Sequence, residues 1–204
     1  MTRVPASEPV CKKQQRKNKM AGERKQQILE TLAKMLESPK REKITTAALA
    51  AKLNVSEAAL YRHFAGKAQM FESLINFIEQ ALFGVINKIT SEEPDGFAQV
   101  RRIVGVLLMF AEKNPGMTRV LIGDALVNEN EALQQRVNQL LDRLEITIKQ
   151  SLKIAATESG GKIQPDAQAN LIICFVIGRW HQYAKSGFKR KPMEFAQLQL
   201  GMLC

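Results

Sequence analysis

The stretch that decides the fold is ITTAALAAKLNVSEAALYRHFAGKAQMF, residues 44–71. It contains two short helical patterns, with Leu49 on the apolar side of the first and Leu60 and Phe64 on that of the second. Asn54 lies between them, where a tight turn can require a left-handed backbone that asparagine tolerates almost as well as glycine. A short helix, a tight turn and a second short helix form a helix-turn-helix, whose second helix enters the major groove of DNA.

The outward positions of this stretch suit a DNA backbone. Hydroxyl groups that can donate to phosphates come from Thr45, Thr46, Ser56 and Tyr61. Lys67, at the start of the next helix, adds a positive charge to a helix N-terminus. Few side chains can read bases, because Ala58 reaches only a thymine methyl group and Arg62 is the one long donor nearby. We therefore expect an interface rich in phosphate contacts, and the sequence leaves the operator undefined.

The distribution of charge also favours DNA. Residues 1–67 hold fifteen Lys or Arg against six Asp or Glu, whereas residues 68–204 hold fifteen against fourteen. The excess positive charge lies with the helix-turn-helix, as in a module that binds a polyanion. An anionic membrane surface is less suitable, because the basic residues 12–25 include only two apolar side chains. Residues 1–21 are polar and basic, and we expect a disordered arm there.

The rest of the chain predicts long helices and no sheet, so the expected fold class is all-α. Helical spacing of apolar residues indicates long helices over residues 22–38, 66–90, 129–156 and 166–185. It also indicates two helices within residues 97–127, with a break at Asn114-Pro115-Gly116. Residues 22–67 would form a three-helix DNA-binding domain with a helix-turn-helix. Residues 68–204 would form a larger helical core and dimerisation domain.

The helix expected over residues 166–185 is apolar nearly all round through LIICFVIG. Such a helix must be covered on every side. Pairing of the last two long helices with their copies in a second subunit covers it economically and gives a two-fold symmetric four-helix interface. We therefore expect a homodimer, and the alternative is a core formed wholly within one chain.

Several other classes of protein lack support. The three cysteines, Cys11, Cys174 and Cys204, have no CxxC spacing, so neither a disulfide framework nor a metal site is expected. The longest apolar run, residues 171–177, is too short to span a membrane. No phosphate loop, HExxH or GxSxG motif occurs, and the two histidines, His63 and His181, fall in separate expected domains. We expect a cytoplasmic protein that is not an enzyme and needs no cofactor.

Residues 44–71 resemble the DNA-binding domain of the TetR family of regulators, in which an LYxHF-like end of the recognition helix precedes a lysine that opens the next helix. The segments ILETLAKMLES, MFESLINFIE, AEKNPGMTRVL and RVNQLLDRLE resemble those of the nucleoid occlusion factors within that family, over roughly residues 22–150. This resemblance implies a homodimer that binds chromosomal DNA and antagonises assembly of the tubulin-like division protein FtsZ into a ring over the nucleoid.

The resemblance also implies roles for particular residues. DNA contacts would come from Thr45, Thr46, Ser56, Tyr61, His63 and Lys67. The FtsZ-facing surface would lie near Phe77, Lys113 and Asn114. Val85 stands where the family tends to have arginine.

The alternative within the TetR family is a transcriptional repressor that a small-molecule effector releases from DNA. Four residues could line an effector cavity in that case: Met109, Phe110, Trp180 and His181.

Overall fold

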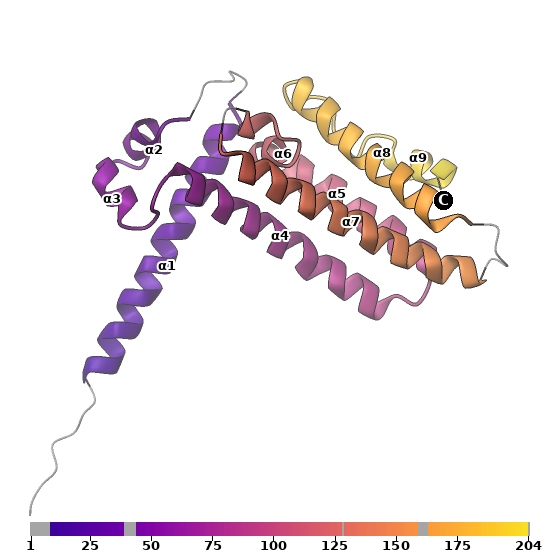
Figure 1. The fold of residues 1–204 in the computed structure, drawn as a ribbon, viewed down its shortest axis with the longest axis horizontal. Helices are drawn as coiled ribbons and strands as arrows, with labels where there is room; N and C mark the ends of the chain where they lie inside the picture. The colour runs from indigo at the N-terminus through magenta and orange to yellow at the C-terminus, as the bar shows by residue number, and fades with distance from the viewer. Residues whose placement is uncertain (1–8, 39–43, 128, 159–162, 204) are drawn as a thin grey trace, which may run out of the picture.

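The computed structural model describes residues 9–38, 44–127, 129–158 and 163–203, and these residues form helices without any strand (Figure 1). The helices are α1 (Pro9–Leu36), α2 (Thr46–Lys52), α3 (Glu57–Tyr61), α4 (Lys67–Glu92), α5 (Gly96–Lys113), α6 (Pro115–Leu121), the 3-10 helix η1 (Asp124–Leu126), α7 (Glu131–Glu158), α8 (Pro165–Lys185) and α9 (Ala196–Leu203). This confirms the expected all-α class, with a helix-turn-helix unit at one end of a larger helical core.

Two elements differ from the expectation. The first helix begins at Pro9 rather than at residue 22, so residues 9–21 of the expected disordered arm continue α1 as helix, while residues 1–8 lie outside the described residues. The expected boundary depends on where apolar residues begin, but residues 9–21 are rich in Lys, Gln and Arg, which have high helix propensity. The short helix α9 was not expected from its sequence, and it follows a segment whose carbonyls accept hydrogen bonds from Arg179.

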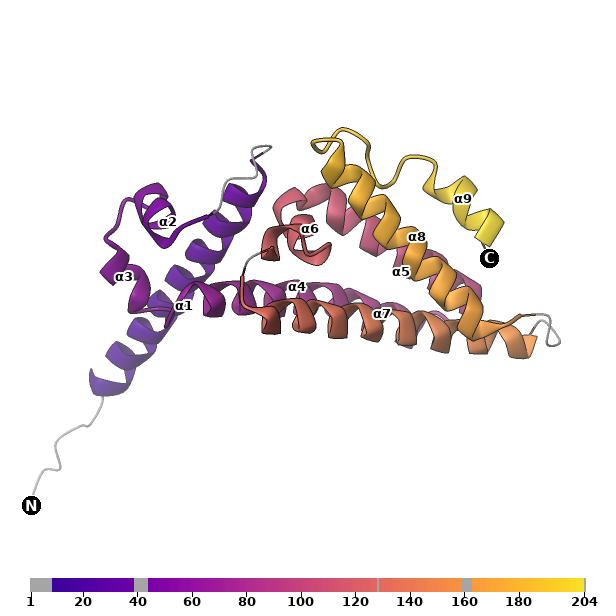
Figure 2. The same ribbon diagram turned by 45° about the horizontal axis from the view of Figure 1, so that its top comes forward.

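The helices surround one continuous core. The long helices α4, α5, α7 and α8 run side by side, and α2 and α3 lie beside α1 at the opposite end from α9 (Figures 1 and 2). Buried side chains from α1 through α9 belong to a single cluster. Trp180 of α8 is fully buried, and its indole N–H donates to the carbonyl of Leu107 on α5 at 3.2 Å. The boundary expected between residues 67 and 68 falls at the start of α4, inside this shared packing, and it stays a prediction.

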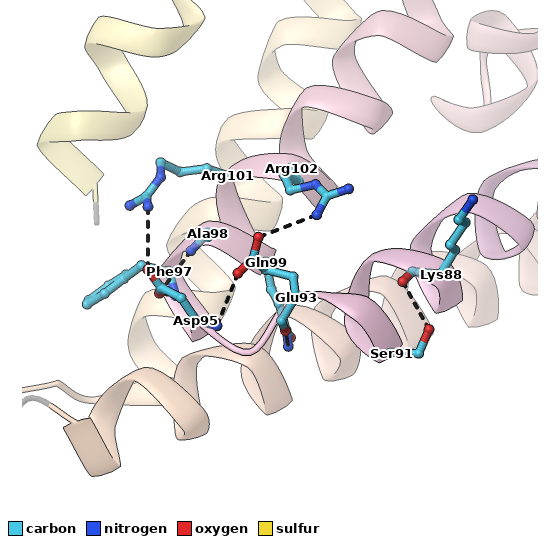
Figure 3. A network of polar contacts seen from close by, with 9 residues as sticks. All are labelled: Lys88, Ser91, Glu93, Asp95, Phe97, Ala98, Gln99, Arg101 and Arg102. Carbon is cyan, nitrogen blue, oxygen red and sulfur yellow. Dashed lines mark hydrogen bonds and ion pairs between the residues drawn. The ribbon is translucent and has the colours of Figure 1, made fainter.

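The turn between α4 and α5 is defined by capping. The Asp95 carboxylate accepts from the backbone N–H groups of Phe97 and Ala98 at 2.8 and 3.1 Å (Figure 3). The Gln99 amide donates to the carbonyl of Glu93 at 2.6 Å and so closes the end of α4. These bonds satisfy backbone groups that a helix terminus leaves free, and they determine where the two helices end.

Helix α6 joins the core to the C-terminal end of α1. A Cβ atom on Gly116 would lie 1.9 Å from the carbonyl oxygen of Ala33, so the two backbones approach as closely as only glycine allows. Arg119 is buried and donates to the carbonyls of Leu36 and Ser38 at 3.0 and 3.1 Å. Its guanidinium also pairs with Asp124 at 2.7 Å. These contacts hold α1 in a defined position against the core.

Candidate nucleic-acid interface

Helices α2 and α3 each begin with a hydroxyl cap. The Thr45 hydroxyl accepts from the backbone N–H of Ala48 at 3.1 Å, and the Ser56 hydroxyl accepts from that of Ala59 at 3.3 Å. Such caps stabilise short helices that cannot persist alone. A hydroxyl that accepts through one lone pair can still donate its hydrogen, so both side chains suit a phosphate at a helix N-terminus.

The turn between α2 and α3 has the conformation that the sequence predicts. Asn54 has a φ of 54°, in the left-handed region. Its backbone N–H donates to Ala51, and that of Val55 donates to Ala50 at 3.0 Å. The turn therefore closes on the last residues of α2 and directs α3 across it.

The inward side of the unit joins it to its neighbours. Leu49 of α2, Leu60 of α3 and Phe64 are buried, and they belong to the same cluster as Ile28 of α1 and Phe71 of α4. Lys25 lies 5.6 Å from the centre of the Phe64 ring. The two short helices owe their stability to this packing against α1 and α4, which leaves their other side available for a ligand.

Most of the predicted DNA contacts lie on the accessible side. Five of the eight residues are exposed: Thr45, Ser56, Ala58, Tyr61 and Arg62. Half of the Tyr61 side chain is accessible, at 49%. His63 is half-buried just after α3, where its backbone N–H donates to Leu60 at 2.9 Å. The predicted hydroxyls and Arg62 thus lie on or next to α2 and α3, which stand at one end of the molecule (Figure 1).

Two of the predicted contacts are engaged within the protein. The Thr46 hydroxyl donates to the Glu57 carboxylate at 2.6 Å, across the turn between α2 and α3. The Lys67 ammonium forms an ion pair with Glu129, which lies between η1 and α7. Sequence reasoning missed both carboxylates. Glu57 could have been noticed as an acidic residue after the Ser56 cap, but no local signal connects Glu129 with a lysine 62 positions away.

The residues predicted to bind a protein partner come from different segments, with Phe77 on α4, Lys113 at the end of α5 and Asn114 just before α6. Phe77 is 43% exposed and lines an apolar cavity of about 210 Å³ together with Leu29 and Met117. Asn114 precedes α6, and its side chain donates to the Phe110 carbonyl at 2.8 Å, while the neighbouring Lys113 is exposed.

The residues considered for an effector cavity do not form one buried site. Trp180 is packed in the core and hydrogen-bonded to Leu107. Met109 is 44% exposed, and His181 is exposed as well. Across the part of the chain that the structure describes, no group of His, Cys, Asp or Glu could hold a metal ion. None of its helices has the length and apolar character of a membrane span.

Comparison with known proteins agrees with this geometry. Residues 41–74 match the model of the bacterial regulatory proteins of the tetR family, and residues 94–204 match the tetracyclin repressor-like C-terminal domain. The regulator PfmR from Thermus thermophilus has a similar fold, with a TM-score of 0.71, 22% identity, and coverage of 86% of this chain and 96% of that one. The chain is thus a helix-turn-helix DNA-binding protein of the TetR class.

Curated relatives place it more narrowly. The chain is 50% identical to the nucleoid occlusion factor SlmA of Alteromonas mediterranea, over 84% of this chain and 89% of the relative. It is 46% identical to SlmA of Shewanella amazonensis, over 88% of this chain and 92% of that relative. The chain belongs to the SlmA family of nucleoid occlusion factors.

Proposed function

We propose that the protein binds chromosomal DNA as a homodimer through α2 and α3, and that the dimer antagonises FtsZ ring assembly over the nucleoid. The observation that carries DNA binding is the pair of hydroxyl-capped helices, with Tyr61 and Arg62 exposed beside them. The excess of nine positive charges over residues 1–67 adds a long-range attraction for the duplex. DNA binding would keep the protein on the nucleoid.

The surface of α7 and α8 supports the dimer. Ile146 of α7 is 57% exposed and Leu171 of α8 is 52% exposed. The residues next to them in sequence are in contact, because the Asn170 amide donates to the Glu145 carboxylate at 3.2 Å. The two apolar side chains therefore lie on neighbouring helical turns, where a second copy can cover them.

The apolar cavity beside Phe77 supports a protein partner. An aromatic ring at the edge of a small apolar cavity, with the exposed Lys113 on the neighbouring segment, suits a short peptide with apolar and acidic side chains. We assign FtsZ binding to this surface. Val85, two turns further along α4 and 47% exposed, would lie at its margin.

DNA binding can be tested with a single hydroxyl. Tyr61→Phe removes a phosphate donor without changing shape. It should weaken binding about fivefold for each protomer, or roughly thirtyfold for the dimer, because one hydrogen bond is worth about 1 kcal/mol. The matched control is Tyr183→Phe, at the other tyrosine, which lies on α8. Fluorescence anisotropy with a strongly bound chromosomal fragment measures both. Equal affinities of the two variants would remove Tyr61 from the interface.

The cellular role requires two further measurements. Genome-wide mapping should find many bound sites over the chromosome that become sparse near the replication terminus, whereas a few promoter sites would indicate an ordinary repressor. Phe77→Ala should reduce co-sedimentation of the DNA-bound protein with FtsZ polymers and leave DNA affinity unchanged. Leu198→Ala, at an exposed apolar position on α9, is the control. Co-sedimentation that Phe77→Ala leaves intact would exclude this surface.

A further inference from the structure

Lys67 is the first residue of α4, and its charge is held inside the protein. Its ammonium forms an ion pair with the Glu129 carboxylate, and the two side chains are only 20% and 13% exposed. The ammonium also lies 5.6 Å from the centre of the Phe71 ring, which is buried. The lysine therefore folds back along its own helix toward the core.

Glu129 approaches Lys67 from the core side of the molecule. Its backbone N–H donates to the carbonyl of Leu126 at 2.9 Å, and Leu126 is buried. The preceding segment is anchored as well, because Asp124 of η1 pairs with the buried Arg119. The segment that bears the Glu129 carboxylate is thus anchored to the core.

A DNA phosphate and Glu129 require the same ammonium. The predicted phosphate position lies at the N-terminus of α4, where the helix dipole also favours an anion. The single positive charge of Lys67 cannot neutralise two anions, and a carboxylate and a phosphate within reach of one ammonium repel each other. A phosphate that binds Lys67 is therefore repelled by the Glu129 carboxylate unless that carboxylate moves away.

We propose that Glu129 limits the DNA affinity of this protein by competing with a backbone phosphate for the Lys67 ammonium. The inference rests on the proposed DNA binding and adds a residue to it that lies outside the helix-turn-helix. Glu129 is a positioning residue, because it acts on DNA only through Lys67. The strength of the contact between Lys67 and a DNA phosphate would then depend on Glu129, which belongs to the core side of the molecule.

The test measures, by fluorescence anisotropy, how variants with one charge removed bind a 30-base-pair duplex from a strongly bound chromosomal site. Glu129→Gln frees Lys67 and should tighten binding by about fivefold for each protomer, the effect of losing a partly buried ion pair. Glu131→Gln makes the same charge change two residues further on, at the exposed start of α7, and should change affinity by less than about twofold at ordinary salt. Glu129→Asp shortens the side chain and should give an intermediate increase.

The double variant separates competition from simple charge repulsion. In a Lys67→Gln background, Glu129→Gln should have no further effect on DNA affinity, because the group it acts through is absent. An equal increase in that background, or no increase with Lys67 present, would overturn the inference while DNA binding stands. A wild-type protein that fails to bind the duplex would instead defeat the proposed function, and the inference with it. Thermal unfolding of each variant confirms that the compared proteins are folded.

Discussion

The contact between α1 and α6 allows a sharp prediction about Gly116. A Cβ atom there would lie 1.9 Å from the carbonyl oxygen of Ala33 and 2.9 Å from its carbonyl carbon, whereas real Cβ contacts essentially never fall below 3.0 Å. The obstacle is backbone, so it cannot rotate away, and the helices must separate by at least about 1 Å. A gap of that size removes a quarter to a half of the dispersion energy across a packed surface. Gly116→Ala should therefore lower the free energy of unfolding by about 2–4 kcal/mol.

Urea unfolding followed by circular dichroism measures this loss. The control is Gly105→Ala in α5, where a Cβ meets nothing within 4 Å. That variant should be more stable than the wild type by about 0.5–1 kcal/mol, because alanine favours helix over glycine. An unfolding free energy of Gly116→Ala within about 0.5 kcal/mol of the wild type would show that α1 and α6 are not packed as closely as described.

Two further predictions concern the turn and the pH dependence. Asn54→Ala should lower the free energy of unfolding by about 1 kcal/mol, because alanine is strained at a φ of 54°. Asn54→Gly should change this free energy little. The control Asn87→Ala, on the exposed side of α4, should not lower it. Burial, with smaller contributions from Glu112 and Glu37, raises the pKa of Tyr183 above 10.0. The unfolded chain then releases this proton first, so stability that is present below about pH 10 should fall as the pH rises above it. That fall should be smaller in Tyr183→Phe, and equal pH profiles of the two proteins would contradict it.

The helix-turn-helix could be predicted because its determinants are local. Helical spacing places Leu49 and Leu60 on inward sides, Ser56 is a strong cap, and Asn54 tolerates the left-handed turn. The long helices were predictable for the same reason, since their apolar side chains repeat with the helical period. Each of these signals is contained within a few residues, so one sequence is enough to identify it.

The remainder depends on contacts between distant segments. The start of α1 at Pro9 reflects helix propensity, which amphipathic spacing does not measure. The engagement of Lys67 by Glu129 depends on how η1 and α7 pack beside α4, which no spacing rule contains. The sequence could therefore identify the chemical groups of the candidate interface, but not which of these groups already have a partner within the protein.

The helix-turn-helix packs against the core through α1 and α4. Ile28 on α1 and Phe71 on α4 pack in the same cluster as the inward side chains of α2 and α3. At its other end α1 is held by Arg119, whose guanidinium binds two carbonyls there. The cavity beside Phe77 lies between α1, α4 and α6, so a partner bound in it contacts the helices that position the DNA-binding unit. A change in the angle of α1 would consequently alter both surfaces together.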